Sequence, residues 1–89
     1  MIHVERVVGK VVHFYPKISV AVVEVQAEIR KGDRIAIRGK TTNFEQVVES
    51  MQIEHKPIEV AKPGQRIGLK VKERVREGDL VFKIEEEAI

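Results

Sequence analysis

Apolar and polar residues alternate with a period of two along most of the chain, which predicts β-strands rather than helices. The expected strands include 7–14, where Gly9 marks a bulge or a close approach of two backbones. The cleanest alternation lies over 34–38 and 66–72, with large aliphatic residues on one parity and mostly basic or small residues on the other. No stretch carries a helical period, so the pattern indicates an all-β chain.

One expected strand departs from simple alternation. Val20 and Val22 share one parity, whereas Val23 and Val25 lie on the other. This switch suggests a β-bulge or bend near Val22, because a bulge shifts the side-chain parity of a strand by one residue. Of the four, Val20 and Val22 are expected to face inward.

Glycine and proline separate the strands. Pro63-Gly64 fits the two central positions of a type II turn, and Gly32 suits a backbone with positive φ. The segments 30–35 and 76–81 echo each other, since both place a charged residue, Gly and Asp before an apolar strand. Roughly six or seven short strands with turns every eight to twelve residues are typical of a sandwich or barrel, and a closed barrel leaves no long exposed edge.

The expected core consists of the apolar residues on the inward parity of each strand. It comprises Val11, Val20, Val22, Ile35, Ile37, Met51, Ile67, Leu69, Val71, Leu80, Phe82 and Ile84. Val and Ile far outnumber Leu, and these β-branched side chains fit a pleated sheet better than a helical turn. The acidic run 85–87 is expected to be a solvated tail.

Composition sets the scale of the fold. The 89 residues are expected to form one domain over 1–89, and no cysteine is present to build a disulfide or a thiolate metal site. No apolar run approaches the ~20 residues of a membrane span, and the first residues lack a signal-peptide pattern. We expect a cytoplasmic protein without a membrane partner. The net charge of +2 is too small to indicate nucleic-acid binding by itself.

Five short motifs, in matching order and spacing, resemble the β-barrel second domain of translational GTPases such as elongation factor Tu. They are Val8-Gly9-Lys10-Val11-Val12, Ile29-Arg30-Lys31-Gly32-Asp33-Arg34-Ile35, Val48-Glu49-Ser50-Met51, Ala61-Lys62-Pro63-Gly64-Gln65-Arg66-Ile67-Gly68-Leu69 and Val75-Arg76-Glu77-Gly78-Asp79-Leu80-Val81. The resemblance covers about residues 7–84. The stretch 51–57 is also similar to the C-terminal barrel of collagenase-type peptidase family proteins, a wider family that includes RNA-modifying enzymes.

The resemblance implies a small closed Greek-key β-barrel of six to seven strands. It implies no GTP hydrolysis, because the chain lacks the Gly-rich loop with Lys and Ser or Thr that cradles phosphates in a GTPase. In the translation-factor family the second domain docks on the GTPase domain, contacts ribosomal RNA and, in tRNA-carrying members, holds the aminoacylated 3′ end. We therefore expect a non-enzymatic binding module that contacts ribosomal RNA or tRNA.

Two cationic rows are candidates for contact with RNA. Arg34 and Arg38 lie on the outward parity of one expected strand, and Arg66, Lys70 and Lys72 lie on the outward parity of another. Phosphate binding would follow from charge complementarity if the two strands lie close together. The alternative, which the small net charge favours, is that these are ordinary solubilising side chains.

A second set of candidates follows from register with the tRNA-carrying relatives. The resemblance places Gln52, His55 and Arg66 at positions that line the aminoacyl-end pocket there. No catalytic residue, metal site or cofactor is expected, because the histidines lack further ligands at metal spacing and neither serine has a neighbouring base. The alternative function is a protein-interaction adaptor that docks on a separately encoded partner, such as a GTPase or an RNA-modifying enzyme.

Overall fold

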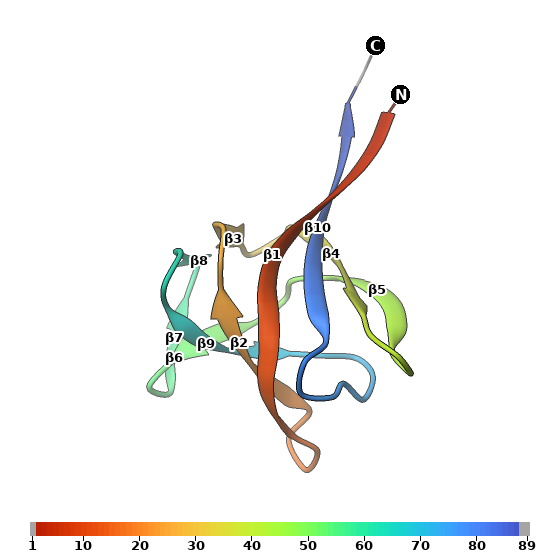
Figure 1. The fold of residues 1–89 in the computed structure, drawn as a ribbon. Helices are drawn as coiled ribbons and strands as arrows, with labels where there is room; N and C mark the ends of the chain where they lie inside the picture. The colour runs from red at the N-terminus through yellow and green to blue at the C-terminus, as the bar shows by residue number, and fades with distance from the viewer. Residues whose placement is uncertain (1, 88–89) are drawn as a thin grey trace.

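The computed structural model describes residues 2–87, with side chains for 3–86, and its regular structure is entirely β-strand. The strands (Figure 1) are β1 (Ile2–Tyr15), β2 (Val20–Val25), β3 (Ile29–Arg30), β4 (Arg34–Arg38), β5 (Asn43–Val47), β6 (Met51–Ile53), β7 (Lys56–Ile58), β8 (Val60–Ala61), β9 (Arg66–Lys70) and β10 (Leu80–Glu87). The expected all-β class is confirmed. The domain expected over 1–89 extends at both ends beyond the described residues. Within them, no helix is long and apolar enough to span a membrane, and the cytoplasmic location stays a prediction.

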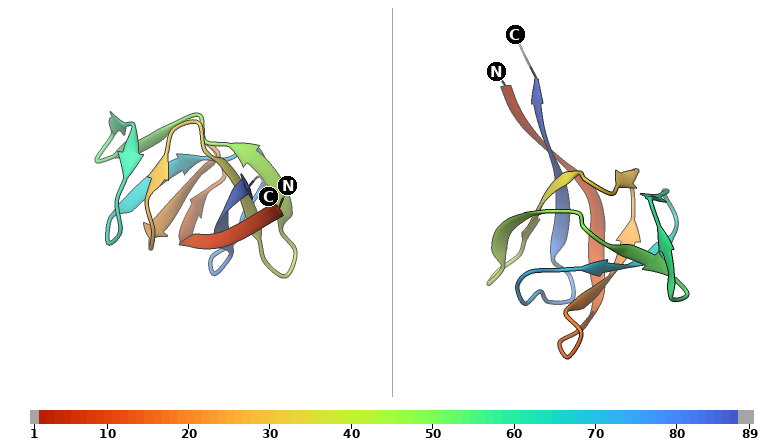
Figure 2. Two further views of the ribbon diagram at one scale, coloured as in Figure 1. Left: turned by 90° about the horizontal axis from the view of Figure 1, so that it is seen from above. Right: turned by 180° about the vertical axis from the view of Figure 1, so that it is seen from behind.

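Eight strands form one antiparallel sheet in the order β5-β4-β10-β1-β2-β9-β6-β7, and β3 pairs with β8. The large sheet curls around an apolar core (Figure 2). Its edges, β5 and β7, are not paired with each other among the described residues, so the closed barrel of six to seven strands is not confirmed. Instead, the buried Gln46 side chain of β5 reaches the end of β9, donating to the Lys70 carbonyl and accepting from the Lys72 N–H, both at 2.8 Å.

Strand β1 takes part in two ladders. Its first part pairs with β10 and its second part with β2, and the two ladders overlap near Gly9. One register shift separates Val7 from Gly9, and another separates Val11 from His13. Gly9 confirms the expected close approach, because a Cβ at this position would lie 2.6 Å from Cγ1 of Val23.

The parity break expected in β2 therefore lies in β1. Strand β2 is regular: Ala21, Val23 and Val25 are buried, while Val20 and Val22 are only half-buried and line the outer face. The expectation that Val20 and Val22 face inward was wrong, because the bulges of β1 absorb the irregularity and leave β2 to alternate along its whole length.

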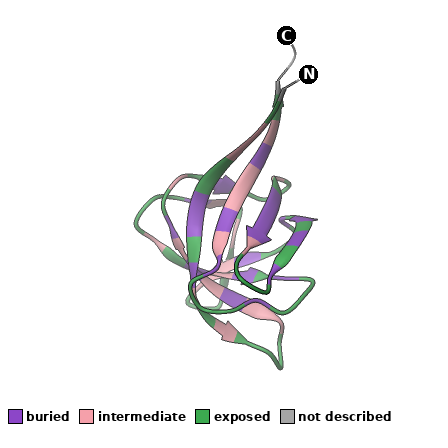
Figure 3. Cartoon of the chain, turned by 45° about the vertical axis from the view of Figure 1, so that its right-hand side comes forward, coloured by how far each residue is buried: buried purple, intermediate pink, exposed green. Residues whose placement is uncertain are grey.

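The other core expectations are mostly confirmed. Figure 3 shows that buried positions recur along the strands of the domain body. The buried members are Val11, Ile35, Ile37, Met51, Ile67, Leu69, Val71 and Ile84. Leu80 and Phe82 are half-buried, because Val81 between them takes the inward position opposite Ile37. The Phe82 ring instead lies under Arg38, whose guanidinium carbon is 6.0 Å from the ring centre.

Strands β1 and β10 leave the body of the domain as a two-stranded ribbon (Figure 1). The run 85–87 belongs to this ribbon and pairs with residues 2–4 of β1. The solvated tail expected there was wrong, since the backbone of these residues forms a ladder. Charged side chains suit such a ribbon, because it has no core of its own to cover them.

The echoing segments form the same turn. In 30–33 and 76–79 the third residue is a glycine, with φ of 96° and 94°, and the Asp carboxylate accepts from the N–H of the first residue at 2.8 Å. Each turn also exchanges two backbone hydrogen bonds with one residue elsewhere in the chain, Val48 for the first turn and Val11 for the second. The turn at 62–65 is confirmed as well, with Gly64 at φ 90° in its third position.

Replacing Leu69 with Ala should lower the free energy of unfolding by about 2–5 kcal/mol, because a fully buried side chain leaves a cavity when it is truncated. Urea denaturation followed by circular dichroism measures this change. Val47→Ala is the matched control, since Val47 is 48% exposed, and it should change stability by less than about 0.5 kcal/mol. Equal effects of the two substitutions would contradict the assigned core.

Candidate functional site

A cleft of about 430 Å³ lies on the outer face of the sheet, over strands β2, β6 and β9. Its lining consists of Tyr15, Ile18, Val20, Val22, Gln52, Ile53, Glu54, His55, Arg66, Ile67 and Gly68. The structure thus brings the three register-derived candidates, Gln52, His55 and Arg66, to one place.

The floor of the cleft follows from the strand register. Val22 of β2 pairs with Gly68 of β9, and Gly68 pairs in turn with Gln52 of β6. Because Gly68 has no side chain, the floor is low at the centre; a Cβ there would lie 3.2 Å from side-chain atoms of both Val20 and Gln52. The glycine therefore makes room for a group from outside.

One wall of the cleft is apolar and exposed. Tyr15 at the end of β1 is 49% exposed and Ile18, in the turn before β2, is 55% exposed. The Tyr15 ring packs edge-on against the His13 ring, with 4.4 Å between their centres. Large apolar side chains this open to water, next to the half-buried Val20 and Val22, are typical of a surface that contacts another molecule.

The opposite wall is a strained turn. Glu54 and His55 connect β6 to β7, and both have positive φ, 50° and 65°. Two positive-φ residues between paired strands form a type I′ turn, which Asn-Gly adopts most readily. The neighbouring Ser19 also has positive φ, 54°, beside the apolar wall. Strain at non-glycine residues tends to cluster at functional sites, and these three positions surround or adjoin the cleft.

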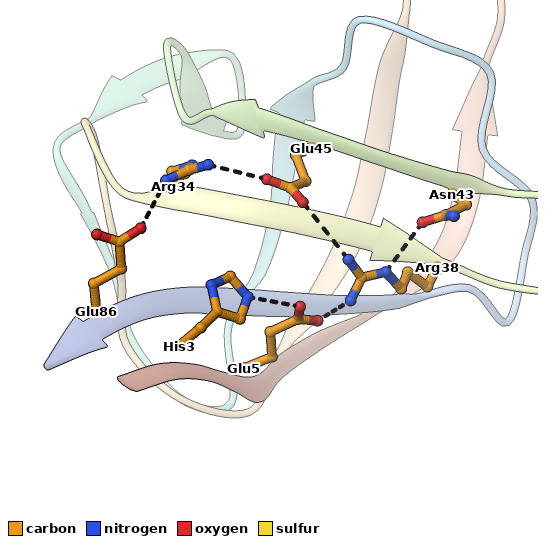
Figure 4. Close-up of polar contacts among 7 residues, drawn as sticks. All are labelled: His3, Glu5, Arg34, Arg38, Asn43, Glu45 and Glu86. Carbon is orange, nitrogen blue, oxygen red and sulfur yellow. Dashed lines mark hydrogen bonds and ion pairs between the residues drawn. The ribbon is translucent and has the colours of Figure 1, made fainter. Parts of the chain in front are cut away.

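The first cationic row is neutralised by carboxylates (Figure 4). A chain of alternating charges runs through Glu86, Arg34, Glu45, Arg38 and Glu5. Arg34 lies 3.3 Å from an oxygen of Glu45 and 3.5 Å from one of Glu86, and Arg38 contacts Glu5 and, at 3.8 Å, Glu45. The two arginines therefore hold β4 to β5 and to the ribbon.

The second row is not adjacent to the first in the sheet, because β10, β1 and β2 lie between β4 and β9. Arg66 lies 3.4 Å from Glu24. The Lys70 ammonium donates to the Ile18 carbonyl at 2.8 Å, and so fixes the turn that carries the apolar wall. Lys72 is exposed. Among the side chains the structure describes, no three His, Asp or Glu are grouped to hold a metal ion.

Comparison with known proteins connects this domain to an enzyme family. Residues 5–81 match the family model of the peptidase family U32 C-terminal domain. The chain belongs to this family. A protein of Methanocaldococcus jannaschii named as an uncharacterized protease is 51% identical over 80 residues, which is 89% of this chain and 20% of that protein. A Porphyromonas gingivalis protein named collagenase is 38% identical over 80 residues, 88% of this chain and 22% of that protein.

A solved structure agrees with this assignment. The C-terminal domain of a Geobacillus thermoleovorans protein assigned to the U32 peptidases has a TM-score of 0.82 and 28% identity, covering 86% of this chain and 90% of that one. This U32 domain therefore shares its fold with that domain. It spans only about a fifth of the length of the curated relatives it matches.

These findings correct the expected function. A translation-factor module that binds RNA was wrong, because the family model and the named relatives are those of peptidases, and the resemblance to elongation factor Tu is not confirmed. The expectation of a non-enzyme was also wrong at the level of the family, whose relatives are named protease and collagenase. The similarity of 51–57 to collagenase-type proteins is confirmed. The expected RNA or protein partner stays a prediction, and its protein alternative is taken up below.

The sequence analysis missed three apolar residues that line the cleft of this U32 domain, namely Ile18, Val20 and Val22. The signal was present in β2, where both parities are apolar. A strand that is apolar on both faces predicts either a bulge or an outer surface that takes a partner. We expected a bulge or bend at Val22, whereas the structure has an apolar outer surface there.

Replacing Glu54 with Asn and His55 with Gly together should raise the free energy of unfolding by about 1 kcal/mol, because Asn-Gly adopts a type I′ turn with little strain. Urea denaturation measures the gain. The matched control places the same two residue types at Glu49 and Ser50, which do not have positive φ, and should give no gain. A turn variant less stable than the wild type would show that the turn is not strained.

Proposed function

We propose that this chain serves as the C-terminal domain of a U32-family peptidase and that its cleft binds an extended segment of polypeptide substrate. The observation that carries the proposal is the cleft itself: an apolar floor and wall with polar side chains converging on its rim. Ligand sites typically have this composition and a volume of about 300–1,000 Å³.

The rim offers groups that suit a peptide backbone. The Gln52 amide makes no hydrogen bond with the described residues, so both its donor and its acceptor are available to a peptide group. The floor beside it, at Gly68, accommodates one side chain of the bound segment. The names protease and collagenase, borne by the relatives, support a polypeptide as the ligand.

The strained turn supports the same proposal. A sequence selected for stability alone would carry Asn-Gly between β6 and β7, whereas this chain carries Glu54 and His55 on the rim. In this proposal the Glu54 and His55 side chains contact the bound polypeptide, and that contact offsets the conformational cost of the turn.

A capped heptapeptide of Gly and Ser with one central Leu should bind in the cleft and shift the backbone amide signals of Val20, Val22 and Gly68 in an NMR titration. The same peptide with Ser in place of Leu should bind at least about 10-fold more weakly, because burying a Leu side chain contributes about 1.5–3 kcal/mol.

Variants locate the binding. Ile18→Ser and Val22→Thr should each weaken binding of the Leu peptide several-fold, since both side chains line the cleft. Val47→Thr, on an exposed position of β5, is the matched control and should bind as the wild type does. Binding that is absent, or that Val47→Thr weakens equally, would refute the proposal.

A further inference from the structure

A second hollow adjoins the cleft on the far side of the His13–Tyr15 ring pair. Its volume is about 420 Å³, and its lining consists of His13, Phe14, Arg74, Val75, Arg76 and Glu77. Tyr15 lines the first cleft and His13 the second, and the two rings are in contact. An extended segment that crosses this ring pair would lie in both hollows.

The two hollows differ in charge. The first mixes Arg66 and His55 with Glu54. The second is lined by Arg74 and Arg76, and neither guanidinium group makes an ion pair or side-chain hydrogen bond with any described residue. Its single carboxylate, Glu77, lies 3.7 Å from Nδ1 of His13.

Unpaired arginines are unusual on this surface. Arg30, Arg34, Arg38 and Arg66 each lie within 4 Å of a carboxylate. Arg74 and Arg76, by contrast, have no carboxylate partner among the described residues. They are available to pair with carboxylates of a bound molecule. Arginine binds carboxylates through charge-assisted, often bidentate hydrogen bonds.

We infer that the bound polypeptide places an apolar side chain in the first cleft and acidic side chains in the second hollow, against Arg74 and Arg76. This inference rests on the proposed function and names its substrate class: polypeptide segments in which acidic residues accompany an apolar one. Two guanidinium groups fit two side-chain carboxylates better than the single carboxylate of a chain end.

The test uses two pairs of capped octapeptides, all with one Leu. Each pair consists of an Asp-Asp form and an Asn-Asn form. The dipeptide lies two residues after the Leu in one pair and two residues before it in the other. The Asp form of one pair should bind about 5- to 10-fold more tightly than its Asn form in an NMR titration. The advantage should shrink as salt rises from 20 to 300 mM, because the carboxylates meet exposed arginines.

Variants separate this inference from the proposed function. Arg74→Gln with Arg76→Gln should abolish the advantage of the Asp peptide and leave the affinity for the Asn peptide unchanged. The matched control, Lys31→Gln with Lys62→Gln, removes the same charge from exposed side chains next to β3 and β8 and should keep the advantage.

Five outcomes would overturn the inference. Equal binding of Asp and Asn peptides in both placements would refute the acidic preference and leave the polypeptide cleft standing, whereas no binding of any peptide would refute both. If the lysine control variant also loses the tighter binding of the Asp peptide, the preference would come from net charge alone. An Asn peptide whose free C-terminal carboxylate restores the full advantage, or a single-stranded oligouridylate that binds the hollow more tightly than the Asp peptide, would assign the arginines to another ligand.

Discussion

The close approach of β1 to β2 at Gly9 is the constraint on which the rest of the fold depends. With no side chain at this position, the backbone of β1 comes within contact of Val23 and Glu24, and one strand can serve two ladders. On one side of Gly9, β1 forms the ribbon with β10; on the other side, it forms the sheet with β2. Any side chain here would have to displace backbone as well as the Val23 methyl group.

The cleft is a consequence of the same strand. A second register shift, between Val11 and His13, turns the end of β1 so that the rings of His13 and Tyr15 meet on the outer face. Strand β2, freed from any bulge, then presents Val20 and Val22 beside them. The register shift of β1 and the regular alternation of β2 together produce an apolar surface outside the core. Such a surface fits a domain that belongs to a peptidase family.

The sequence predicted the features that depend on a few neighbouring residues. The glycine turns at 32 and 64, the close approach at Gly9 and the inward parity of β4 and β9 follow from backbone conformation and alternation, and the structure has them. The sequence shows that both faces of β2 are apolar, but which face is buried depends on a bulge in a different strand. Gln52, His55 and Arg66 line one cleft, while the function expected from the translation-factor family was wrong. The strands bring these side chains together, but the chemistry of the ligand depends on what the side chains are.

The domain is held together by two kinds of interaction that respond differently to heat: burial of apolar side chains in the core, and the ion pairs that attach the ribbon to β4 and β5. The core coheres by burial of aliphatic side chains, whose stabilisation per unit area levels off as temperature rises. The chain from Glu86 to Glu5 coheres by ion pairs, and the cost of removing charged groups from water falls on heating. At high temperature the ion pairs that attach the ribbon therefore contribute a larger share of the stability relative to the core. They act where a loosely held ribbon would fray first.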